Sequence, residues 1–351
     1  MKQLIQKQKI VGERMIKTAV AVFVTATVCQ FFELPAVFAV IIAIVTIEPT
    51  AAASIRKGII RFPAALIGAA LAMTFTYFFG HTALTYTLSA FLTIYVCHKL
   101  RLEAGALIAT ITAVAMIPIT NDHYFLSFVE RAGTTTIGLC VSTLVNLTIL
   151  PAHFLKDISR RNQELLKRIA ILLEQQIKDI QQRRPHQASR KSAYRELSAE
   201  LTKNEMLCQY QCDEWKYHSH SIREQRVYLH ERNKLEHIQQ IHYYIGHLFT
   251  IHPLEAQPND SHSFELDEIV RLLINRLHEP SQPVNEGSVT LLEQFDHRFW
   301  NERNEGLADK KNDKHLFSQQ DLITFVLLSI DDELDEIAKI EKKKQKLERI
   351  R

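Results

Sequence analysis

The feature that most constrains this chain is an arginine that recurs, seventy positions later, in the same surroundings. Arg61 opens the apolar run RFPAALIGAALAMTFTYFF and Arg131 opens RAGTTTIGLCVSTLVNLTI, with Gly68 and Gly138 seven residues further on. The same offset brings other pairs into register: Ile47 with Ile117, and Thr50 with Thr120. Two copies of one apolar unit predict a domain that arose by duplication.

Charge divides the chain into two unlike parts. The first 151 residues hold 11 Lys or Arg and 6 Asp or Glu, whereas the remainder holds 31 and 33. The excess of positive charge therefore lies between apolar runs and does not indicate a nucleic-acid partner. We expect a transmembrane domain at 1–152 and an α-helical domain at 153–351, with the division near Pro151.

Six apolar segments of the first part are candidates for membrane spans. A bilayer core of about 30 Å requires about 20 residues of helix. We expect spans at 15–33, 34–55, 61–80, 82–99, 103–121 and 129–151. Shifted by seventy positions, the first three spans coincide with the last three.

Basic residues lie in alternate connections between these spans. They precede the first span, follow the sixth, and lie in two connections between, at Arg56, Lys57 and Arg61 and at Lys99 and Arg101. By the positive-inside rule, both termini and the second domain are expected in the cytoplasm. Because each repeat has three spans, the second copy enters the bilayer from the opposite side. Inverted repeats of this kind are typical of secondary transporters.

Glu48, Pro49 and Thr50 interrupt the second apolar segment. A carboxylate at membrane depth is costly unless it is neutralised, paired or facing water. Pro49 removes a backbone donor and predicts a helix break, and Pro118 predicts the corresponding break in the fifth span, beside Thr120. One interpretation gives Glu48 a role in binding protons or substrate. The other places it at a helix end, paired with Arg56 or Lys57.

Arg61 and Arg131 also have two interpretations. A guanidinium is always charged and grips a carboxylate with two hydrogen bonds, so both residues are candidates to bind organic anions. Alternatively, they anchor helix ends at the membrane interface. Asn146, in the last span, is a further candidate because a buried amide needs a polar partner.

Small residues at a spacing of four favour close helix packing around Gly68 and Gly138. Cys208, Cys212, His218 and His220 match no established zinc pattern, and we expect no metal and no cofactor. The sequence contains no phosphate-binding Gly-Lys-Ser/Thr loop, and no catalytic set of residues is recognisable. We therefore do not expect an enzyme.

The second part has the apolar periodicity of long helices. One stripe comprises Leu235, Ile238, Ile241, Ile245 and Leu248, and another comprises Leu322, Val326, Ile330, Leu334, Ile337 and Ile340. This spacing predicts a helical bundle, in part a coiled coil. The expected fold class is thus all-α: a six-span membrane domain with inverted three-helix repeats, and a cytoplasmic helical bundle.

The segments VGERMIKTAVAVFVT, VTIEPTAAASIRKGIIRFPAALIGAAL and RAGTTTIGLCVSTLVNLTILP resemble the bacterial aromatic acid exporter family. That family is related to fusaric acid resistance proteins and to plant aluminium-activated malate transporters. The resemblance covers 10–152 and implies export or conduction of organic anions across the bacterial plasma membrane. It also implies a homodimer, because larger relatives carry two six-span units.

These observations favour a multi-pass transporter that exports aromatic or other organic carboxylates by secondary active transport. The substrate-binding candidates are Arg61, Arg131, Glu48, Thr50, Thr120 and Asn146. The expected partners are membrane lipid, small organic anions and a second copy of the chain. Two alternatives remain: a passive anion channel, and a membrane-anchored scaffold or sensor in which the helical part acts.

Overall fold

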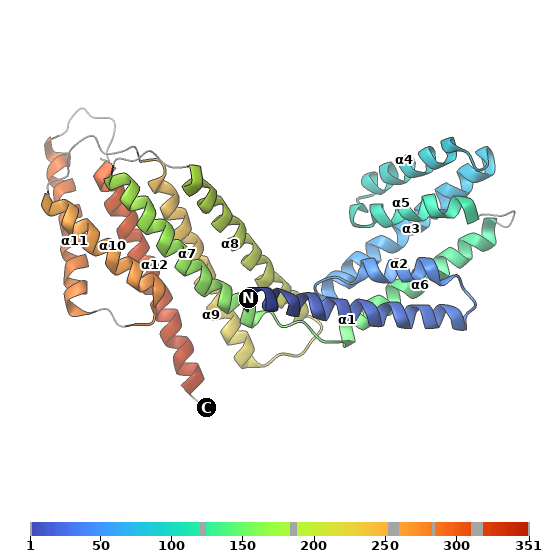
Figure 1. The fold of residues 1–351 in the computed structure, drawn as a ribbon, viewed down its shortest axis with the longest axis horizontal. Coiled ribbons are helices and arrows are strands. Elements are labelled where there is room, and N and C mark those ends of the chain that lie inside the picture. The colour runs from blue at the N-terminus through green and yellow to red at the C-terminus, as the bar shows by residue number, and fades with distance from the viewer. Residues whose placement is uncertain are drawn as a thin grey trace. The chain divides into compact units, whose positions relative to one another are not determined.

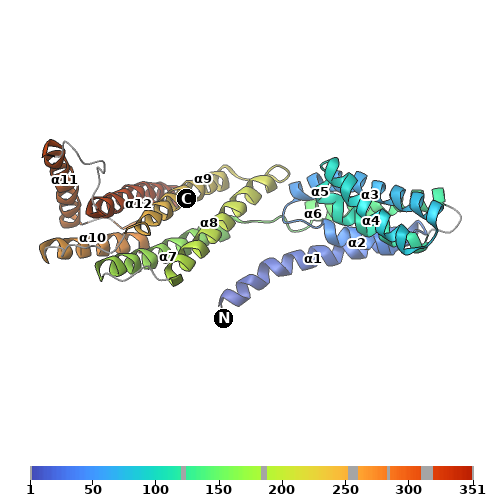
Figure 2. The ribbon, with the colours of Figure 1, turned by 90° about the horizontal axis from the view of Figure 1, so that it is seen from above.

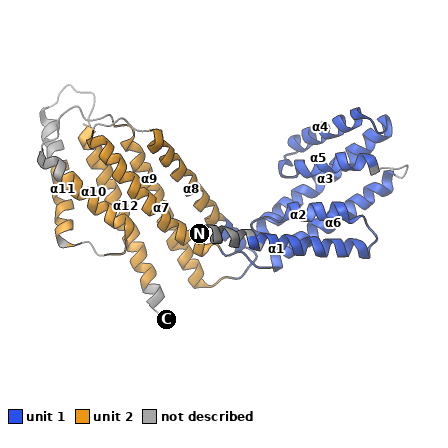
Figure 3. Cartoon of the chain, in the orientation of Figure 1, with its two compact units in different colours: residues 1–153, 210–219 blue, residues 154–209, 220–351 orange. Residues whose placement is uncertain are grey.

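The computed structural model describes residues 2–119, 124–182, 188–251, 260–282, 285–309 and 319–349 (Figure 1). Over these residues the chain forms helices and no strand, which confirms the all-α prediction. Two compact units are present (Figure 3). Unit 1 comprises 1–153 together with 210–219, and unit 2 comprises 154–209 together with 220–351.

Unit 1 contains six α-helices and one 3₁₀ turn within the described residues. They are α1 (Lys2–Phe31), α2 (Ala36–Thr46), α3 (Ala51–Phe79), α4 (Ala83–Lys99), α5 (Glu103–Met116), η1 (Ile117–Ile119) and α6 (Tyr124–Thr148). Helix α2 packs with α1 and α6, and α5 packs with α4 and α3. One group thus comprises α1, α2 and α6, and the other comprises α3, α4 and α5. The two groups meet where α3 contacts α6 (Figure 1).

Small side chains make up much of the interior of unit 1, beside buried isoleucines such as Ile42 and Ile47, and many large apolar side chains face outward. Ala64, Ala69 and Ala72 on α3 are fully buried, whereas Phe23 is 73% exposed and Phe125 is 80% exposed. Small residues allow helix backbones to approach closely. Exposed aromatic residues on several helices are unusual for a surface that faces water.

Two of these helices are long and apolar enough to cross a membrane by length and composition: the Arg14–Phe31 part of α1, and α3. Helices α2 and α5 are apolar but shorter. The segment predicted as one span at 34–55 is divided, because α2 ends at Thr46 and α3 begins at Ala51. The six-span arrangement therefore stays a prediction.

The helices of unit 2 are α7 (Leu155–Gln181), α8 (Ala188–Glu214, whose last residues belong to unit 1), α9 (Ile222–Leu248), α10 (Asp260–His278), α11 (Glu286–Asp309) and α12 (Gln319–Arg349). Helix α9 packs against α7 and α12, and α10 packs against the same two helices (Figures 1 and 2). The predicted apolar stripe of α9 is buried from Leu235 to Leu248, and that of α12 from Val326 to Ile337. The two stripe predictions are confirmed over these residues, and the end residues of the second stripe, Leu322 and Ile340, are half-buried.

Candidate functional site

The interruption between α2 and α3 is closed by side chains. Thr50 caps α3, since its Oγ1 accepts a hydrogen bond from the Ala53 N–H at 3.2 Å. Ser54 Oγ donates to the Thr46 carbonyl at 3.0 Å and lies 3.3 Å from the Glu48 N–H that donates to it. Pro49 has no N–H to satisfy. The break is thus an ordered turn that points Glu48 towards α3.

Glu48 is held by two cations from α3. Its Oε1 accepts from Arg61 Nη2 and its Oε2 from Lys57 Nζ, both at 2.8 Å. Arg61 is 7% exposed and donates also to the Val45 and Ala104 carbonyls, at 3.3 and 3.4 Å. The pairing of Glu48 with Lys57 that the second interpretation anticipated is present. Arg61 and Glu48, two of the predicted substrate ligands, satisfy each other.

Arg131 lies on α6 in a different environment. Its side chain is nearly buried, with a residue exposure of 5%, and its Nη2 donates to Thr112 Oγ1 on α5 at 2.6 Å. The guanidinium carbon lies 3.8 Å from the centre of the Phe38 ring, a cation–π contact. Among the described residues, no acceptor lies within hydrogen-bond reach of Nε or Nη1. Buried donors without acceptors are costly, and these two nitrogens of Arg131 are such donors among the described residues.

Asn146 on α6 joins α1 to the helix break. Its Oδ1 accepts from Lys17 Nζ at 2.9 Å, and its Nδ2 lies 3.1 Å from the Glu48 and Thr50 carbonyls and 2.8 Å from Ser54 Oγ. Lysine only donates and carbonyls only accept, so these neighbours fix the orientation of the amide.

The remaining predicted site residues have structural surroundings. Pro118 lies in the 3₁₀ turn that follows α5, and Thr120 is outside the described residues. A Cβ on Gly68 would lie 2.3 Å from the Ala109 carbonyl oxygen, and one on Gly138 would lie 2.5 Å from that of Ala39. Both glycines therefore sit where one helix backbone touches another.

Sequence reasoning missed several residues of this region. Lys17, one of the basic residues at the start of the first predicted span, lies inside α1 and is buried. Thr112 and Phe38, the neighbours of Arg131, are unremarkable residues in apolar runs. The signal that could have revealed Lys17 is its position, because an ionisable residue at the start of an apolar run needs a polar partner.

Glu214 was also missed. This residue belongs to the 210–219 segment of unit 1 and is 2% exposed. Its carboxylate accepts from the Ala51 N–H at 3.1 Å and from the Ala152 N–H at 3.2 Å. His218 lies 3.2 Å from the same carboxylate through Nδ1, and its Nε2 is 2.7 Å from the Leu147 carbonyl. The segment thus ties the start of α3 to the chain that follows α6.

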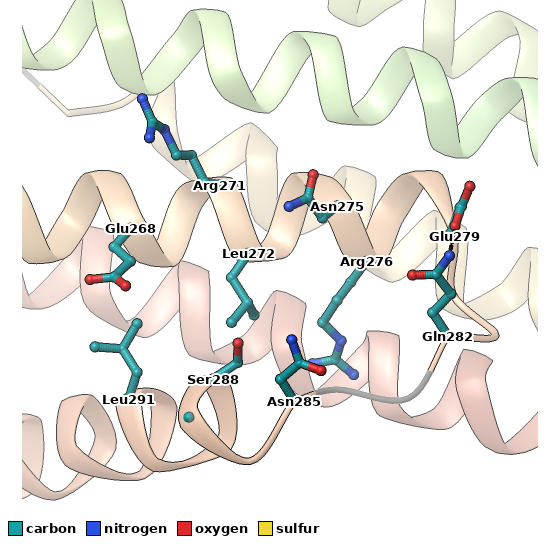
Figure 4. A pocket seen from close by; sticks show the side chains of 11 residues that line it. Glu268, Arg271, Leu272, Asn275, Arg276, Glu279, Gln282, Asn285, Ser288 and Leu291 are labelled. Carbon is teal, nitrogen blue, oxygen red and sulfur yellow. Dashed lines mark hydrogen bonds between the residues drawn. The ribbon is translucent and has the colours of Figure 1, made fainter.

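Unit 2 has an open cavity of about 370 Å³ between α10 and the start of α11 (Figure 4). Its lining comprises Glu268, Arg271, Leu272, Asn275, Arg276, Glu279, Gln282, Asn285, Gly287, Ser288 and Leu291. Arg276 forms ion pairs with Asp331 and Asp335, and Gln282 donates to Glu279. Charges of both signs thus line the cavity, at Glu268, Arg271, Arg276 and Glu279. The described residues contain no group of three or more His, Cys, Asp or Glu that could hold a metal ion.

The described residues thus form an all-helical protein in which an apolar unit encloses three buried cations, Lys17, Arg61 and Arg131. Residues 9–149 match the family model described as Aromatic acid exporter family member 1. A UPF0421 protein of Bacillus cereus (strain ZK / E33L) is 43% identical over 96% of this chain and 95% of its own length. A UPF0421 protein of Staphylococcus haemolyticus is 35% identical over 82% of this chain and 91% of its own.

A UPF0421 protein of Halalkalibacterium halodurans is 37% identical over 77% of this chain and 76% of its own. The chain therefore belongs to the aromatic acid exporter family, with UPF0421 proteins as relatives over most of its length.

Proposed function

We propose that this protein is a membrane transporter that exports organic carboxylate anions, aromatic ones included, by secondary active transport. Membership of an exporter family supports the general function. The observation that carries the specific proposal is Arg131, a buried guanidinium with two nitrogens, Nε and Nη1, whose hydrogens lack acceptors among the described residues. A carboxylate ligand would supply an acceptor and a neutralising charge.

The environment of Arg131 suits an aromatic anion. Its counterpart at the seventy-residue offset, Arg61, is neutralised by Glu48, whereas the position corresponding to Glu48 is Pro118. In this proposal the substrate carboxylate forms an ion pair with Arg131, as Glu48 does with Arg61. Phe38 already lies against the guanidinium, and an aromatic substrate would meet an apolar, aromatic surface there.

The surface of unit 1 supports placement in the plasma membrane. The largest exposed side chains include Phe31, Phe78 and Phe91, and lipid is the solvent in which such a surface is stable. Helix α2 has 11 residues, and a helix of that length spans about 16 Å, roughly half of a bilayer core. We propose six membrane crossings, with α2 and α5 as short, broken segments like those that line transporter binding sites.

Reciprocal contacts support an inverted repeat. Gly68 approaches Ala109, and Gly138 approaches Ala39. Gly138 lies seventy positions after Gly68, and Ala109 lies seventy positions after Ala39, so each contact is the other with the two repeats exchanged. The helix pairs of unit 1 show the same exchange. The α1–α2 pair corresponds to α4–α5, α3–α5 corresponds to α2–α6, and α3–α4 corresponds to α1–α6, while α3–α6 corresponds to itself. A twofold relation between the halves would produce this pattern. A homodimer within lipid is proposed from the six-span size alone.

Flux measurements on purified protein in liposomes test the proposal. Labelled phthalate is a suitable probe because this doubly charged aromatic carboxylate crosses lipid slowly. Arg131→Gln should reduce flux at least about tenfold, the equivalent of one lost charge-assisted interaction. Arg131→Lys should retain part of it, since a point charge replaces the fork. Arg56→Gln, the same change at an exposed arginine of α3, is the control.

Three outcomes decide between the readings. Accumulation of phthalate against its gradient, driven by a pH gradient, supports secondary active transport. Flux that only ever dissipates the phthalate gradient would make the protein a passive channel. Full flux in Arg131→Gln would exclude Arg131 as the anion site.

A further inference from the structure

We propose that a groove formed by α8 and α9 in unit 2 binds an aromatic carboxylate. The groove is an open cavity of about 390 Å³, lined by two basic residues of α8 and by four side chains with aromatic rings: Lys191, Arg195, Tyr194, Tyr243, His247 and Phe249. The inference goes beyond the proposed transport and does not depend on it. The observation behind it is that two cations without acidic partners and a set of ordered rings line one cavity.

The two cations of the groove lie on one face of α8. Lys191 and Arg195 are four positions apart, so their side chains are neighbours on the helix, where like charges repel each other. Both residues are exposed, and neither has an ion-pair partner among the residues that the structure describes. A carboxylate bound in the groove would accept charge-assisted hydrogen bonds from them and reduce the repulsion.

The acidic residues closest along the two helices have other partners. Glu196, the residue after Arg195 on α8, lies 3.5 Å from Arg168 on α7. The last acidic residue of α9 is Glu236, which lies 3.4 Å from Arg232. The rest of α9, from 237 to 248, contains no Asp or Glu. The described parts of α8 and α9 therefore leave a net positive charge at the groove.

The Tyr194 ring is fixed by contacts with α9 and the residue that follows it. The ring stacks on His242, with the ring centroids 4.1 Å apart and 10° between the planes, and its centroid lies 5.3 Å from that of Phe249. Gly246 makes room for it, since a Cβ there would lie 2.6 Å from Tyr194 Oη. An aromatic ring in a defined position offers a flat surface to a planar ligand.

Tyr243 and His247 line the groove from α9. Their ring centroids are 4.8 Å apart and their planes meet at 87°. Tyr243 is 58% exposed, although a ring of this size gains stability when another ring covers it. The rings of the groove thus suit the aromatic part of a ligand, and Lys191 and Arg195 suit its carboxylate. The cavity volume is in the range of small-molecule sites.

The protonation states around the groove agree with an anionic ligand. Burial, with a contribution from Tyr243, raises the pKa of the Tyr194 hydroxyl, so this group keeps its proton and remains a hydrogen-bond donor. Burial lowers the pKa of His242, so the ring stacked on Tyr194 is neutral at physiological pH. The full positive charges at the groove are therefore those of Lys191 and Arg195.

Binding of 4-fluorobenzoate to the full-length protein in detergent, followed by ¹⁹F NMR, tests the proposal. We expect saturable binding in Arg131→Gln, in which the proposed transport site does not contribute. Adding Lys191→Gln and Arg195→Gln together should raise the Kd at least about tenfold, the equivalent of one lost charge-assisted hydrogen bond. Circular dichroism checks that the variants are folded. The same loss should separate wild type from the double variant alone, which covers the case in which Arg131→Gln does not fold.

Arg223→Gln combined with Arg226→Gln is the matched control. Both arginines are exposed on α9, and they lie about 25–30 Å along the helix axis from Tyr243. Screening at physiological salt acts over about 8 Å, so this loss of the same charge should leave the Kd unchanged. Tyr243→Leu, which keeps an apolar side chain without the ring, should weaken binding of benzoate more than binding of cyclohexanecarboxylate.

Competition decides the class of ligand. Benzoate should displace the probe, whereas sulfate, an anion without a ring, and methyl benzoate, a ring without a charge, should not. Equal displacement by either one overturns the assignment to aromatic carboxylates. The absence of saturable binding at millimolar concentrations, or an unchanged Kd when Lys191 and Arg195 are both replaced, overturns the site itself. A protein that shows no phthalate flux but binds 4-fluorobenzoate in this groove would contradict the transport proposal alone.

Discussion

Gly138 shows how a single hydrogen atom in place of a side chain determines helix packing in unit 1. A Cβ there would lie 2.5 Å from the Ala39 carbonyl oxygen, which is part of a helix backbone and has little room to move. We expect Gly138→Ala to lower the free energy of unfolding by about 1–3 kcal/mol, as overpacking does. Thermal unfolding in detergent measures the loss.

Gly58 provides the matched comparison on α3. The nearest atom to a Cβ at Gly58 is Thr143 Oγ1 at 4.0 Å, an ordinary contact. Gly58→Ala should therefore be neutral or raise stability by about 0.5–1 kcal/mol, because alanine restricts the unfolded chain more than glycine does. Equal melting temperatures for the two alanine variants would contradict the packing argument.

Asp331 in unit 2 predicts a pH dependence. Burial raises the pKa of this carboxyl from 3.8 to about 6, with Arg276 opposing the rise and Asp335 and Asp332 adding to it. A carboxyl whose pKa is higher in the folded state stabilises the fold fully below its unfolded pKa and loses that contribution as pH rises through about 6. The effect is on the order of 2 kcal/mol.

Asp331→Asn removes this titration. The protection of α12 amides from hydrogen exchange should fall between pH 4 and about 7 in wild type, and should change much less in the variant. Asp321→Asn, at the start of the same helix, should keep the wild-type slope. A slope that survives in Asp331→Asn would assign the effect to another group.

Residue identity alone revealed part of the candidate site. Glu48, Arg61, Arg131 and Asn146 were recognisable because a polar residue in an apolar run needs a reason to be there. Glu48 neutralises Arg61, and among the described residues Arg131 has no carboxylate partner. Both facts depend on tertiary distances, which the sequence does not contain. The predicted role of Thr50 in substrate binding remains untested, and the structure gives the same hydroxyl another role.

At the scale of the helix, that role is the N-cap of α3. The Thr50 hydroxyl accepts from the Ala53 N–H, and caps of this type contribute about 1 kcal/mol. Thr50→Ala should lower the melting temperature of unit 1, whereas Thr50→Ser, which keeps the hydroxyl, should not. If both variants melt like wild type and flux falls in both, Thr50 contacts substrate instead.

Helix boundaries followed the sequence where a local signal exists. The predicted span 82–99 closely matches α4, Ala83–Lys99, and the α9 stripe is buried as its spacing predicted. The predicted span 34–55 does not correspond to one helix, because Pro49 stops α2 and the Thr50 cap starts α3 four residues after α2 ends. Apolar content identifies material for a span but does not locate breaks within it.

At the scale of the whole molecule, orientation is the property to test. In the proposed orientation, which rests on the alternate basic connections, the α3–α4 connection lies outside the cell and the chain after α6 lies inside. His81→Cys should react with a membrane-impermeant thiol reagent applied to intact cells, and Lys156→Cys should react only after lysis. His81 is preferred to Gly80, whose φ of +62° disfavours other residues. The opposite labelling pattern would reverse the proposed orientation.

The 210–219 segment could not have been predicted. Its attachment to unit 1 includes the Glu214 carboxylate on two backbone N–H groups and His218 beside the Leu147 carbonyl, and such contacts leave no periodicity in the sequence. A division near Pro151 follows from composition, but composition does not show that a short stretch of the polar part belongs with the apolar one.

Glu214 has a consequence for the order of events during synthesis. The N–H groups that it caps belong to residues 163 and 62 positions earlier in the chain. The ribosome therefore delivers all six helices of unit 1, then α7 and nearly all of α8, before the Glu214 carboxylate, which accepts from the Ala51 N–H in addition to the Thr50 cap, has been synthesised. Throughout that interval the start of α3, next to Glu48, lacks the hydrogen bond from the Ala51 N–H to Glu214. Unit 1 therefore reaches its final form only after α7 and nearly all of α8 have been translated.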